Sequence, residues 1–275
     1  MTLEPKDEEV WEQLTQKITQ ITGFNCGNYT PSFLKRRVAT RLYSLNLSLY
    51  KDYLDHLIKT PEEKELLLKE LTIHVTNFFR NKEAFDVFIA ETVMELLSEK
   101  KEKGDKSLKI WSAGCSTGEE PFSIAMILYE MLQLRIKDYN IKIVGSDISP
   151  QTIEQAKKGM YEEIQLKEAP KDYVEKYFEK KDDLYVIKPI IKDMVSFEVS
   201  DILAPFLKNN FDIIFCRNTV IYFTSELKEK LYMNFYNSLN NHGFFVMGMT
   251  ESLTGLAREK FKTYNNSYRI YKKEE

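Results

Sequence analysis

The feature that most constrains the fold is a regular alternation, after residue 80, of short apolar segments with segments of helical length. Five apolar segments follow one another, at residues 108–111, 141–145, 195–199, 211–216 and 243–248. Because they are apolar throughout, both faces of each strand are expected to be covered by helices. The alternation predicts an α/β domain with a parallel sheet, in which residues 261–273 return as a late strand beside the fifth.

The chain before this alternation has a different pattern, that of short amphipathic helices. Apolar residues recur at helical spacing in two segments, one with Val10, Leu14, Ile18 and Ile21, the other with Leu34, Val38, Leu42 and Leu45. Ser48 is expected to cap a third helix, and a capping box at residues 60–63 is expected to begin a fourth. We therefore predict an all-α domain over residues 1–75, followed by the α/β domain over residues 76–275.

One stretch interrupts the alternation of strands and helices. Residues 183–199 carry β-branched side chains on both sides of a predicted turn at Lys192–Asp193. We interpret this stretch as part of a small antiparallel β subdomain, inserted at about residues 177–200 before the third strand of the main sheet.

Composition excludes several classes of protein. The 275 residues carry a net charge of -3, so the chain has no overall attraction for nucleic acid. Its three cysteines are far apart and form no CxxC pair, which argues against a disulfide framework and against a metal site. No apolar run approaches the roughly 20 residues that cross a bilayer, and the N-terminus is acidic. These features predict a cytoplasmic protein without direct membrane insertion.

The sharpest motif is SAGCSTGEEP at residues 112–121, directly after the first strand. Gly114 and Gly118 lie where a strand-to-helix turn must pass close to a ligand, and only glycine leaves that room. Glu119 and Glu120 stand in the first helical turn, where they would repel a pyrophosphate but tolerate a ligand with an ammonium and a sulfonium group. The alternative is that both acids only satisfy the helix dipole.

Acidic residues also follow the second and third strands. Asp147 is not needed as a helix cap, because Ser149 and Pro150 already form a good helix start. An acid at this strand end usually binds the hydroxyls of a ribose, although a turn aspartate can also satisfy local amides. Asp201 and Ile202 could recognise adenine with a polar partner and an apolar wall.

Taken together, these strings resemble the chemotaxis receptor methyltransferases of the CheR type over nearly the whole chain. The resemblance rests on TNFFR at residues 76–80, IWSAGCSTGEEPFSIAM at 110–126, SDIS at 146–149, FDIIFCRNTVIYF at 211–223 and GMTESL at 248–253. It implies a Rossmann-like methyltransferase domain with a small β subdomain, preceded by a helical domain. It also implies that S-adenosylmethionine is the methyl donor, that S-adenosylhomocysteine is the product, and that receptor glutamates are the substrates.

The resemblance implies particular residues of the site as well. Those that should surround the cofactor are Thr76, Arg80, Ala113, Glu119, Asp147, Asp201, Ile202, Arg217 and Asn218. Arg80 and Tyr222 should also face the methyl group and the incoming carboxylate, although Arg80 could be a surface arginine and Tyr222 could belong to the core. His74 stands where relatives usually have asparagine; it can donate one hydrogen bond to the cofactor, or it packs at a helix end.

The chemistry of the reaction fits this set. A glutamate side chain has a reference pKa of about 4.3, so it is already an ionised nucleophile at neutral pH and needs no general base. The sequence has only three histidines and no compelling Ser-His or Cys-His pairing. The enzyme must therefore supply positioning and exclusion of water, and both Arg80 and Tyr222 can serve this as hydrogen-bond donors.

A basic segment in the helical domain predicts how the protein substrate docks. From Phe24 to Tyr50 the chain has four basic residues and no acidic one. Arg36, Arg37 and Arg41 are expected to bind the cytoplasmic helices of chemoreceptors, although a solvated helix face is the simpler alternative. Relatives that also hold the C-terminal pentapeptide of a receptor have a glycine-containing loop in the β subdomain. Residues 177–201 contain no glycine, so no such binding is expected.

Two other functions remain open at this level. The first is a methyltransferase of the same fold that acts on a small carboxylate-bearing molecule, against which the basic helical domain argues. The second is a cofactor-binding sensor or docking module without turnover, against which the presence of Arg80 and Tyr222 argues.

Overall fold

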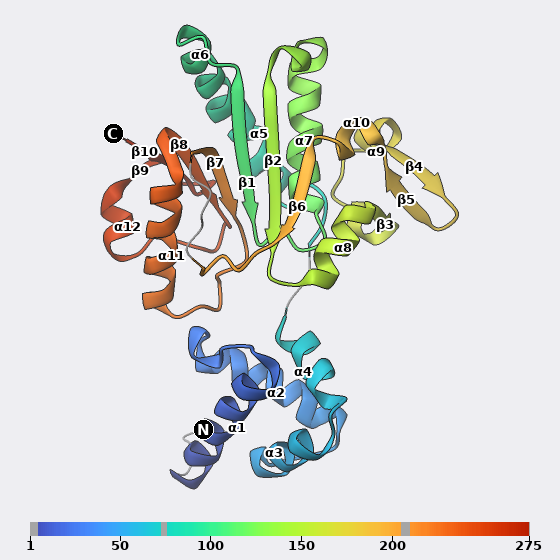
Figure 1. Cartoon of the computed structure of the whole chain (residues 1–275), viewed down its shortest axis with the longest axis vertical. Coiled ribbons are helices and arrows are strands. Elements are labelled where there is room, and N and C mark those ends of the chain that lie inside the picture. Colours follow the sequence, from blue (N-terminus) through green and yellow to red (C-terminus); the bar gives the residue numbers. More distant parts are fainter. Residues whose placement is uncertain (1–4, 73–75, 205–209, 275) are drawn as a thin grey trace. The chain divides into compact units, whose positions relative to one another are not determined.

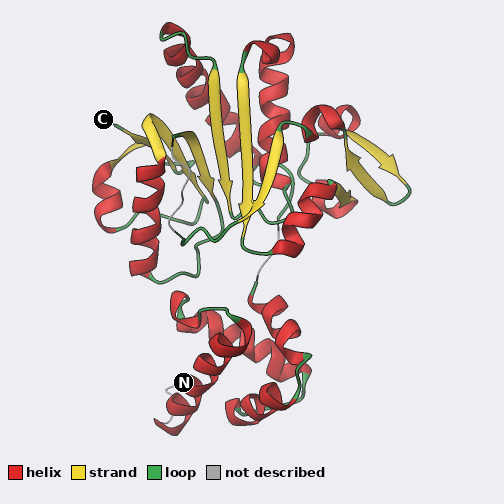
Figure 2. Ribbon diagram, in the orientation of Figure 1, coloured by secondary structure: helices red, strands yellow, loops and turns green. Residues whose placement is uncertain are grey.

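The computed structural model describes residues 5–72, 76–204 and 210–274, and it consists of two compact units. The first unit comprises Met1–His74 together with Tyr222–Leu227, and the second comprises Val75–Ile221 with Lys228–Glu275. Both sheets belong to the second unit, as Figures 1 and 2 show. Among the described residues no helix is long and apolar enough to cross a membrane.

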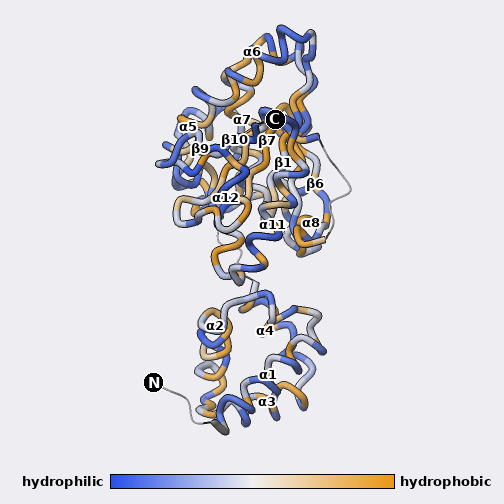
Figure 3. The backbone as a smooth tube through the Cα atoms, turned by 90° about the vertical axis from the view of Figure 1, so that its left-hand side faces the viewer, coloured by the Kyte–Doolittle hydropathy of each residue, from blue (hydrophilic) through white to orange (hydrophobic). Residues whose placement is uncertain are grey.

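The first unit is built from helices. These are α1 (Pro5–Thr22), the 3-10 helix η1 (Cys26–Asn28), α2 (Pro31–Ser44), α3 (Tyr50–Lys59) and α4 (Glu63–Leu71). Hydrophilic and hydrophobic residues alternate along them (Figure 3), and Leu14, Ile18, Val38 and Tyr53 are almost completely buried in a common core. The predicted all-α architecture of this part is confirmed.

Two predicted helix starts in this unit are wrong in detail. The residue that precedes α3 is Leu49 and not Ser48, and it makes no side-chain cap. At α4 the Glu63 carboxylate does not close a capping box. It instead accepts hydrogen bonds from Arg41 and from the Tyr53 hydroxyl, each at 2.8 Å. Glu63 is only 2% exposed, and a buried carboxylate is stabilised more by a cationic partner than by a cap at the surface.

The second unit contains the predicted parallel sheet. Its strands, in sheet order, are β6 (Val195–Val199), β2 (Asn140–Asp147), β1 (Ser107–Ala113), β7 (Phe211–Cys216), β8 (Leu239–Met247), β10 (Ile270–Lys273) and β9 (Phe261–Asn265). The first five are mutually parallel, whereas β10 pairs antiparallel with β8 on one side and with β9 on the other. The segment predicted as one late strand is therefore a hairpin, because the chain reverses after Asn265, whose side chain accepts a hydrogen bond from the Tyr268 amide.

Helices cover both faces of this sheet. On one face lie α5 (Lys82–Phe88), the π-helical turn η2 (Ile89–Val93), α6 (Met94–Glu102) and α7 (Glu119–Leu132). On the other face lies α11 (Ser225–Ser238). Phe88 of α5 packs on Phe215, whereas Phe235 of α11 packs on Trp111. The unit also contains η3 (Gln133–Asp138), α8 (Pro150–Lys158) and α12 (Gly255–Lys260).

A small antiparallel sheet is present, as predicted, but its turn is elsewhere. Its strands are β3 (Met160–Glu162), β5 (Leu184–Ile187) and β4 (Phe178–Lys181), and η4 (Glu163–Leu166) and α9 (Lys171–Tyr177) lie between β3 and β4. The hairpin turn is at Asp182–Asp183, where Asp182 has a φ of +53°, which aspartate tolerates better than most residues. Lys192, which was predicted to lie in the turn, is instead the last residue of the short helix α10 (Pro189–Lys192). Pro189 favours the start of this helix.

Candidate active site

The candidate site is formed by loops at one edge of the main sheet. Because β1, β2, β6, β7 and β8 are parallel, their carboxyl ends reach the same edge, where ligands of open α/β sheets bind. The arrowheads of β1, β2 and β6 meet there in Figure 1. Of the residues predicted to bind the cofactor, Ala113 and Asp147 end two of these strands, and Arg217 and Asn218 directly follow a third.

The glycine loop after β1 needs both of its glycines. Gly114 has a φ of +76°, and a Cβ atom on it would lie 2.6 Å from the Thr219 side chain. Gly118 has a φ of +94° and precedes α7, where a Cβ would lie 3.0 Å from Ala156 and Phe197. The loop after β7 therefore packs directly on the glycine loop.

Asp147 joins two loops at this edge. Its Oδ2 accepts a hydrogen bond from the Ser116 amide at 2.9 Å, and its Oδ1 accepts one from the Ser149 amide at 3.0 Å. Ser149 caps α8, as predicted, by accepting a hydrogen bond from the Thr152 amide. Asp147 thus satisfies local amides, and its Oδ1 also lies 3.4 Å from the Thr152 hydroxyl, but Oδ2 can accept a further hydrogen bond, which leaves capacity for a hydroxyl of a ligand.

The two glutamates that begin α7 have different surroundings. Glu119 is completely buried and accepts hydrogen bonds from Thr117 and from the Gln165 side chain, the latter at 2.5 Å. Burial raises the pKa of the Glu119 carboxyl above its usual value. Glu120 accepts a hydrogen bond from the Ser112 hydroxyl at 2.8 Å and forms an ion pair with Arg217. Both acids therefore have specific partners besides the helix dipole.

Arg217 connects the loop after β7 to the segment that carries Arg80. Its guanidinium donates to the Arg80 carbonyl at 2.9 Å and to Asn81 Oδ1 at 3.1 Å. It also lies 4.9 Å from the centre of the Phe85 ring. The Arg217 side chain is 3% exposed, so the charge is held in place by its protein partners. Arg217 thus fixes the backbone of the segment in which Arg80 lies.

The segment itself is anchored by two phenylalanines. Phe78 and Phe79 are 0% and 2% exposed, and the Phe79 amide donates to the Ser123 hydroxyl at 3.0 Å. Phe79 and Asn81 both have positive φ angles, of 56° and 59°, on either side of Arg80. Such left-handed conformations cost free energy in non-glycine residues and persist where their surroundings enforce them. Thr76 lies at the start of this segment and is partly buried.

Two buried polar atoms at this edge have no hydrogen-bond partner among the described residues. They are Oδ1 of Asn218, a residue with a φ of +58°, and the hydroxyl oxygen of Ser116 in the glycine loop. Buried polar atoms are nearly always hydrogen-bonded, so these two fit a ligand that brings its own donors. The ammonium and hydroxyl groups of S-adenosylmethionine are such donors. Ser116 was not among the predicted residues, although it lies within the glycine motif.

The remaining predicted cofactor residues lie at the ends of described segments. Asp201 follows β6, is exposed, and accepts a hydrogen bond from the Leu203 amide at 2.8 Å. Ile202 is 8% exposed and can offer only a small apolar surface. His74 lies outside the described residues. Gln165, the partner of Glu119, was missed because no pattern links residues 46 positions apart.

Tyr222 belongs to the first unit rather than to the core of the second. Its ring stacks on Phe33 of α2 with ring centres 4.4 Å apart, and the Arg36 guanidinium lies 5.3 Å from the ring centre. Its carbonyl accepts a hydrogen bond from the Thr30 amide at 2.8 Å. Contacts from α2 therefore hold the Tyr222 ring and backbone.

The three arginines predicted to dock the receptor differ in their exposure and in their ion pairs. Arg36 is exposed. Arg37 forms an ion pair with Glu70 at 3.1 Å. Arg41 donates two hydrogen bonds to the buried Glu63 and is mostly covered. Although burial opposes it, the hydrogen bonds from Arg41 and Tyr53 lower the pKa of the Glu63 carboxyl.

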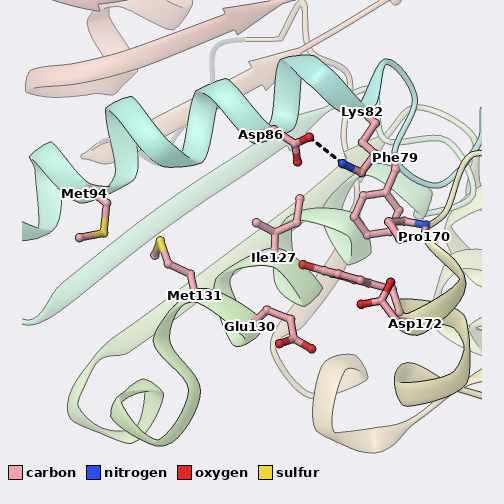
Figure 4. A pocket seen from close by; sticks show the side chains of 10 residues that line it. Phe79, Lys82, Asp86, Met94, Ile127, Glu130, Met131, Pro170 and Asp172 are labelled. Atoms are coloured by element: carbon pink, nitrogen blue, oxygen red, sulfur yellow. Dashed lines mark hydrogen bonds and ion pairs between the residues drawn. The ribbon is translucent and has the colours of Figure 1, made fainter.

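A separate cavity of about 550 Å³ lies between α5, α6, α7 and α9 (Figure 4). Its ten lining residues are Phe79, Lys82, Asp86, Met94, Ile127, Glu130, Met131, Pro170, Asp172 and Tyr173. Asp86 is paired with Lys82, and Glu130 with Lys176. None of the residues predicted to bind cofactor or substrate lines this cavity.

A parallel sheet of this order, with a glycine loop after β1 and an acid at the end of β2, is a Rossmann-like arrangement that suits a ligand with a nucleoside part. Comparison with known families agrees. Residues 74–270 match the family described as the CheR methyltransferase, SAM binding domain, and residues 9–72 match the CheR methyltransferase, all-alpha domain. The chain belongs to the CheR methyltransferase family.

Relatives support the same assignment. A chemotaxis protein methyltransferase of Listeria monocytogenes is 29% identical over 97% of this chain and 98% of its own length. One of Borreliella burgdorferi is 32% identical over 85% of this chain and 84% of its own. The chain is therefore a chemotaxis methyltransferase with a domain that binds S-adenosylmethionine.

Proposed function

We propose that this protein transfers a methyl group from S-adenosylmethionine to glutamate side chains on the cytoplasmic helices of methyl-accepting chemotaxis receptors. The products are a glutamate methyl ester and S-adenosylhomocysteine, and the reaction serves chemotaxis adaptation in the cytoplasm. The observation that carries this proposal is the anchoring of the Arg80 segment by Arg217, beside the glycine loop, in a chain of this family.

The residues at the carboxyl edge of the sheet hold the cofactor in this proposal. S-adenosylmethionine supplies an electrophilic methyl group. Asn218 Oδ1 and the Ser116 hydroxyl accept hydrogen bonds from it, and Asp147 binds its ribose hydroxyls. The other members of the set are His74, Thr76, Arg80, Ala113, Gly114, Glu119, Asp201, Ile202 and Arg217. The buried oxygens of Asn218 and Ser116, which have no partner within residues 5–72, 76–204 and 210–274, support this assignment.

Arg80 and Tyr222 act by positioning the substrate carboxylate. The substrate glutamate is ionised at neutral pH, so no proton has to be removed. Arg80 offers a planar fork of donors that can hold a carboxylate in one orientation. Its fixed backbone supports this role, since the guanidinium then starts from a defined point. Tyr222 supplies a hydroxyl group, and its ring is held by stacking on Phe33.

Helix α2 docks the receptor in this proposal, through Arg36 and Arg37. Arg36 is exposed and Arg37 is partly so, which suits an acidic helical partner. Arg41 contributes indirectly, because its ion pair with Glu63 joins α2 to the start of α4. The β subdomain, with a two-residue turn and no glycine in residues 177–201, does not hold the receptor's C-terminal pentapeptide.

Transfer of radiolabelled methyl groups tests the proposal. The purified protein is incubated with labelled S-adenosylmethionine and a panel of receptor cytoplasmic fragments, and base-labile label on the receptor is counted. Fragments in which the candidate glutamates are replaced by alanine serve as the control. We expect label only on fragments that keep these glutamates. Label on small carboxylate-bearing metabolites, with none on any receptor fragment, would favour the small-molecule alternative.

A further inference from the structure

The loop after β8 places a buried carboxylate against the loop that carries Asn218. Glu251 is 4% exposed and lies four residues beyond the end of β8. Its Oε2 accepts hydrogen bonds from the amides of Gly248 at 2.7 Å and Asn218 at 3.1 Å. Its Oε1 accepts one from the Val220 amide at 3.3 Å. One side chain thus gathers three backbone amides from two loops.

This carboxylate is retained at an energetic cost. Burial raises the pKa of Glu251, while the three amides oppose this shift by stabilising the ionised form. Hydrogen bonds from backbone amides to a carboxylate are among the stronger ones in proteins. They are directed here at Asn218, whose left-handed φ of +58° needs its surroundings to enforce it. The buried Glu251 carboxylate therefore stabilises the strained loop that carries Asn218.

Two glycines show how closely this arrangement is packed. A Cβ atom on Gly248 would lie 2.6 Å from Glu251 Oε2 and 2.8 Å from the Asn218 nitrogen. On the other side of the same loop, a Cβ on Gly114 would lie 2.6 Å from Thr219. The loop from Arg217 to Val220 is thus held between the Glu251 carboxylate and the glycine loop after β1.

We propose that Glu251 is a positioning residue for methyl transfer. By binding the Asn218 and Val220 amides, it sets the place at which Asn218 meets the cofactor and from which Arg217 reaches the Arg80 carbonyl. It acts through these residues and does not itself touch the substrate. This inference rests on the proposed role of Asn218 in binding the cofactor.

Glu251→Gln tests this role with little change of size. The variant replaces a carboxylate oxygen by an amide nitrogen that cannot accept a hydrogen bond. We expect S-adenosylhomocysteine to bind about tenfold or more weakly in calorimetry, the scale for losing a hydrogen bond to a charged group. We also expect kcat to fall while KM for a receptor fragment stays unchanged.

Glu229→Gln is the matched control. Glu229 accepts a hydrogen bond from the Leu256 amide at 2.9 Å, so it also holds a backbone amide, but this amide belongs to the first turn of α12 and not to the loop from Arg217 to Val220. We expect this variant to keep wild-type affinity for S-adenosylhomocysteine and wild-type kcat. If both variants lose affinity equally, the effect is a general loss of stability and the proposal is wrong.

A double-mutant cycle separates positioning from general stability. If Glu251 acts through Asn218, the variant with both Glu251→Gln and Asn218→Ala should lose clearly less affinity than the two single losses combined. Additive losses would contradict the proposal. Because S-adenosylhomocysteine binding needs no receptor, this result does not depend on whether receptor glutamates are the substrates.

Hydrogen exchange gives a test that does not depend on whether variants fold. In the wild-type protein without ligand, the amides of Asn218, Val220 and Gly248 should exchange slowly, because the Glu251 carboxylate holds them. Exchange of all three at the rates of unprotected amides would show that the carboxylate does not bind them, and the proposal would fail.

Discussion

At the scale of single residues, the site is built from side chains that each serve two loops. Asp147 accepts hydrogen bonds from amides of the glycine loop and of the start of α8. Arg217 binds both Glu120 and the Arg80 segment. A substitution at such a residue therefore removes a ligand contact and loosens a loop together.

The first prediction concerns Asp147. We expect Asp147→Ala to weaken binding of S-adenosylmethionine and S-adenosylhomocysteine by about 1–3 kcal/mol, the scale for losing hydrogen bonds to a charged group. Ser149→Ala is the control, because it removes the cap of α8 without touching the Asp147 carboxylate. Calorimetry gives both affinities. Unchanged affinity in a folded Asp147→Ala protein would remove the ribose assignment.

The second prediction concerns Arg80. Arg80→Lys keeps the charge but loses the planar fork, and Arg80→Ala loses both. If Arg80 orients the carboxylate, both variants should lose turnover by about 10²-fold or more, as small misplacements of reacting groups do. Affinity for the cofactor should fall much less, because Asp147 and the glycine loop remain. Near-full turnover of Arg80→Lys would reduce its role to bulk electrostatics, and a parallel collapse of cofactor binding would make it a binding residue.

At the scale of elements, α2 combines a structural and an exposed face. Arg41 forms an ion pair with Glu63, and Phe33 stacks on Tyr222. Arg36 and Thr40, by contrast, are exposed. Tyr43 is 87% exposed on the same helix. These exposed residues form the face that we propose for receptor docking.

The third prediction tests this face. Replacing Arg36 and Arg37 by glutamate should lower kcat/KM for receptor fragments and leave cofactor affinity unchanged. The control replaces two exposed lysines of α3, Lys51 and Lys59, by glutamate, which changes the net charge by the same amount. The wild-type rate should also fall with salt, since such steering is screened beyond about 8–10 Å. Equal activity of both variants and wild type at low salt would refute docking through α2.

The fourth prediction concerns the β subdomain. Its β4–β5 turn consists of only Asp182 and Asp183, and residues 177–201 contain no glycine. Removal of the last several residues of a substrate receptor should therefore leave the methylation rate unchanged. The rates of full-length and truncated receptors are compared at subsaturating concentration, where a lost docking contact would appear most clearly. A large drop on truncation would mean that this sheet does hold the receptor tail.

At the scale of the whole molecule, the chain forms two compact units with separate cores. Apart from His74, the residues assigned to the cofactor belong to the second unit, and the arginines assigned to docking belong to the first. Two cores of this kind can unfold in separate steps, so ligand binding should stabilise only the unit that holds the ligand.

The fifth prediction follows from this division. S-adenosylhomocysteine at 100 times its dissociation constant should stabilise the second unit by about 2.7 kcal/mol. Hydrogen exchange resolved by residue checks this, because amides of β1, β2 and β7 should slow while those of α1 and α3 keep their rates. Equal slowing in both units would show that they unfold as one.

Much of the fold could be predicted from the sequence because local patterns carry it. The fully apolar strands required a covered parallel sheet, and helical spacing required the all-α part. Gly114 and Gly118 could be identified because left-handed backbone and close packing exclude other residues. Local signals failed where tertiary contacts were stronger. Glu63 binds Arg41 instead of closing the predicted capping box, and the segment predicted as one final strand is a hairpin.

The candidate site divides in the same way. The sequence by itself determined which loops meet, since parallel strands must end at one edge of the sheet. Only the tertiary structure decided which groups those loops leave for a ligand. In that structure the buried Glu119 accepts a hydrogen bond from Gln165, and Arg217 donates one to the Arg80 carbonyl. Glu251 accepts one from the Asn218 amide. The physical reason is that hydrogen bonds between residues far apart in the chain depend on distances that no local pattern encodes.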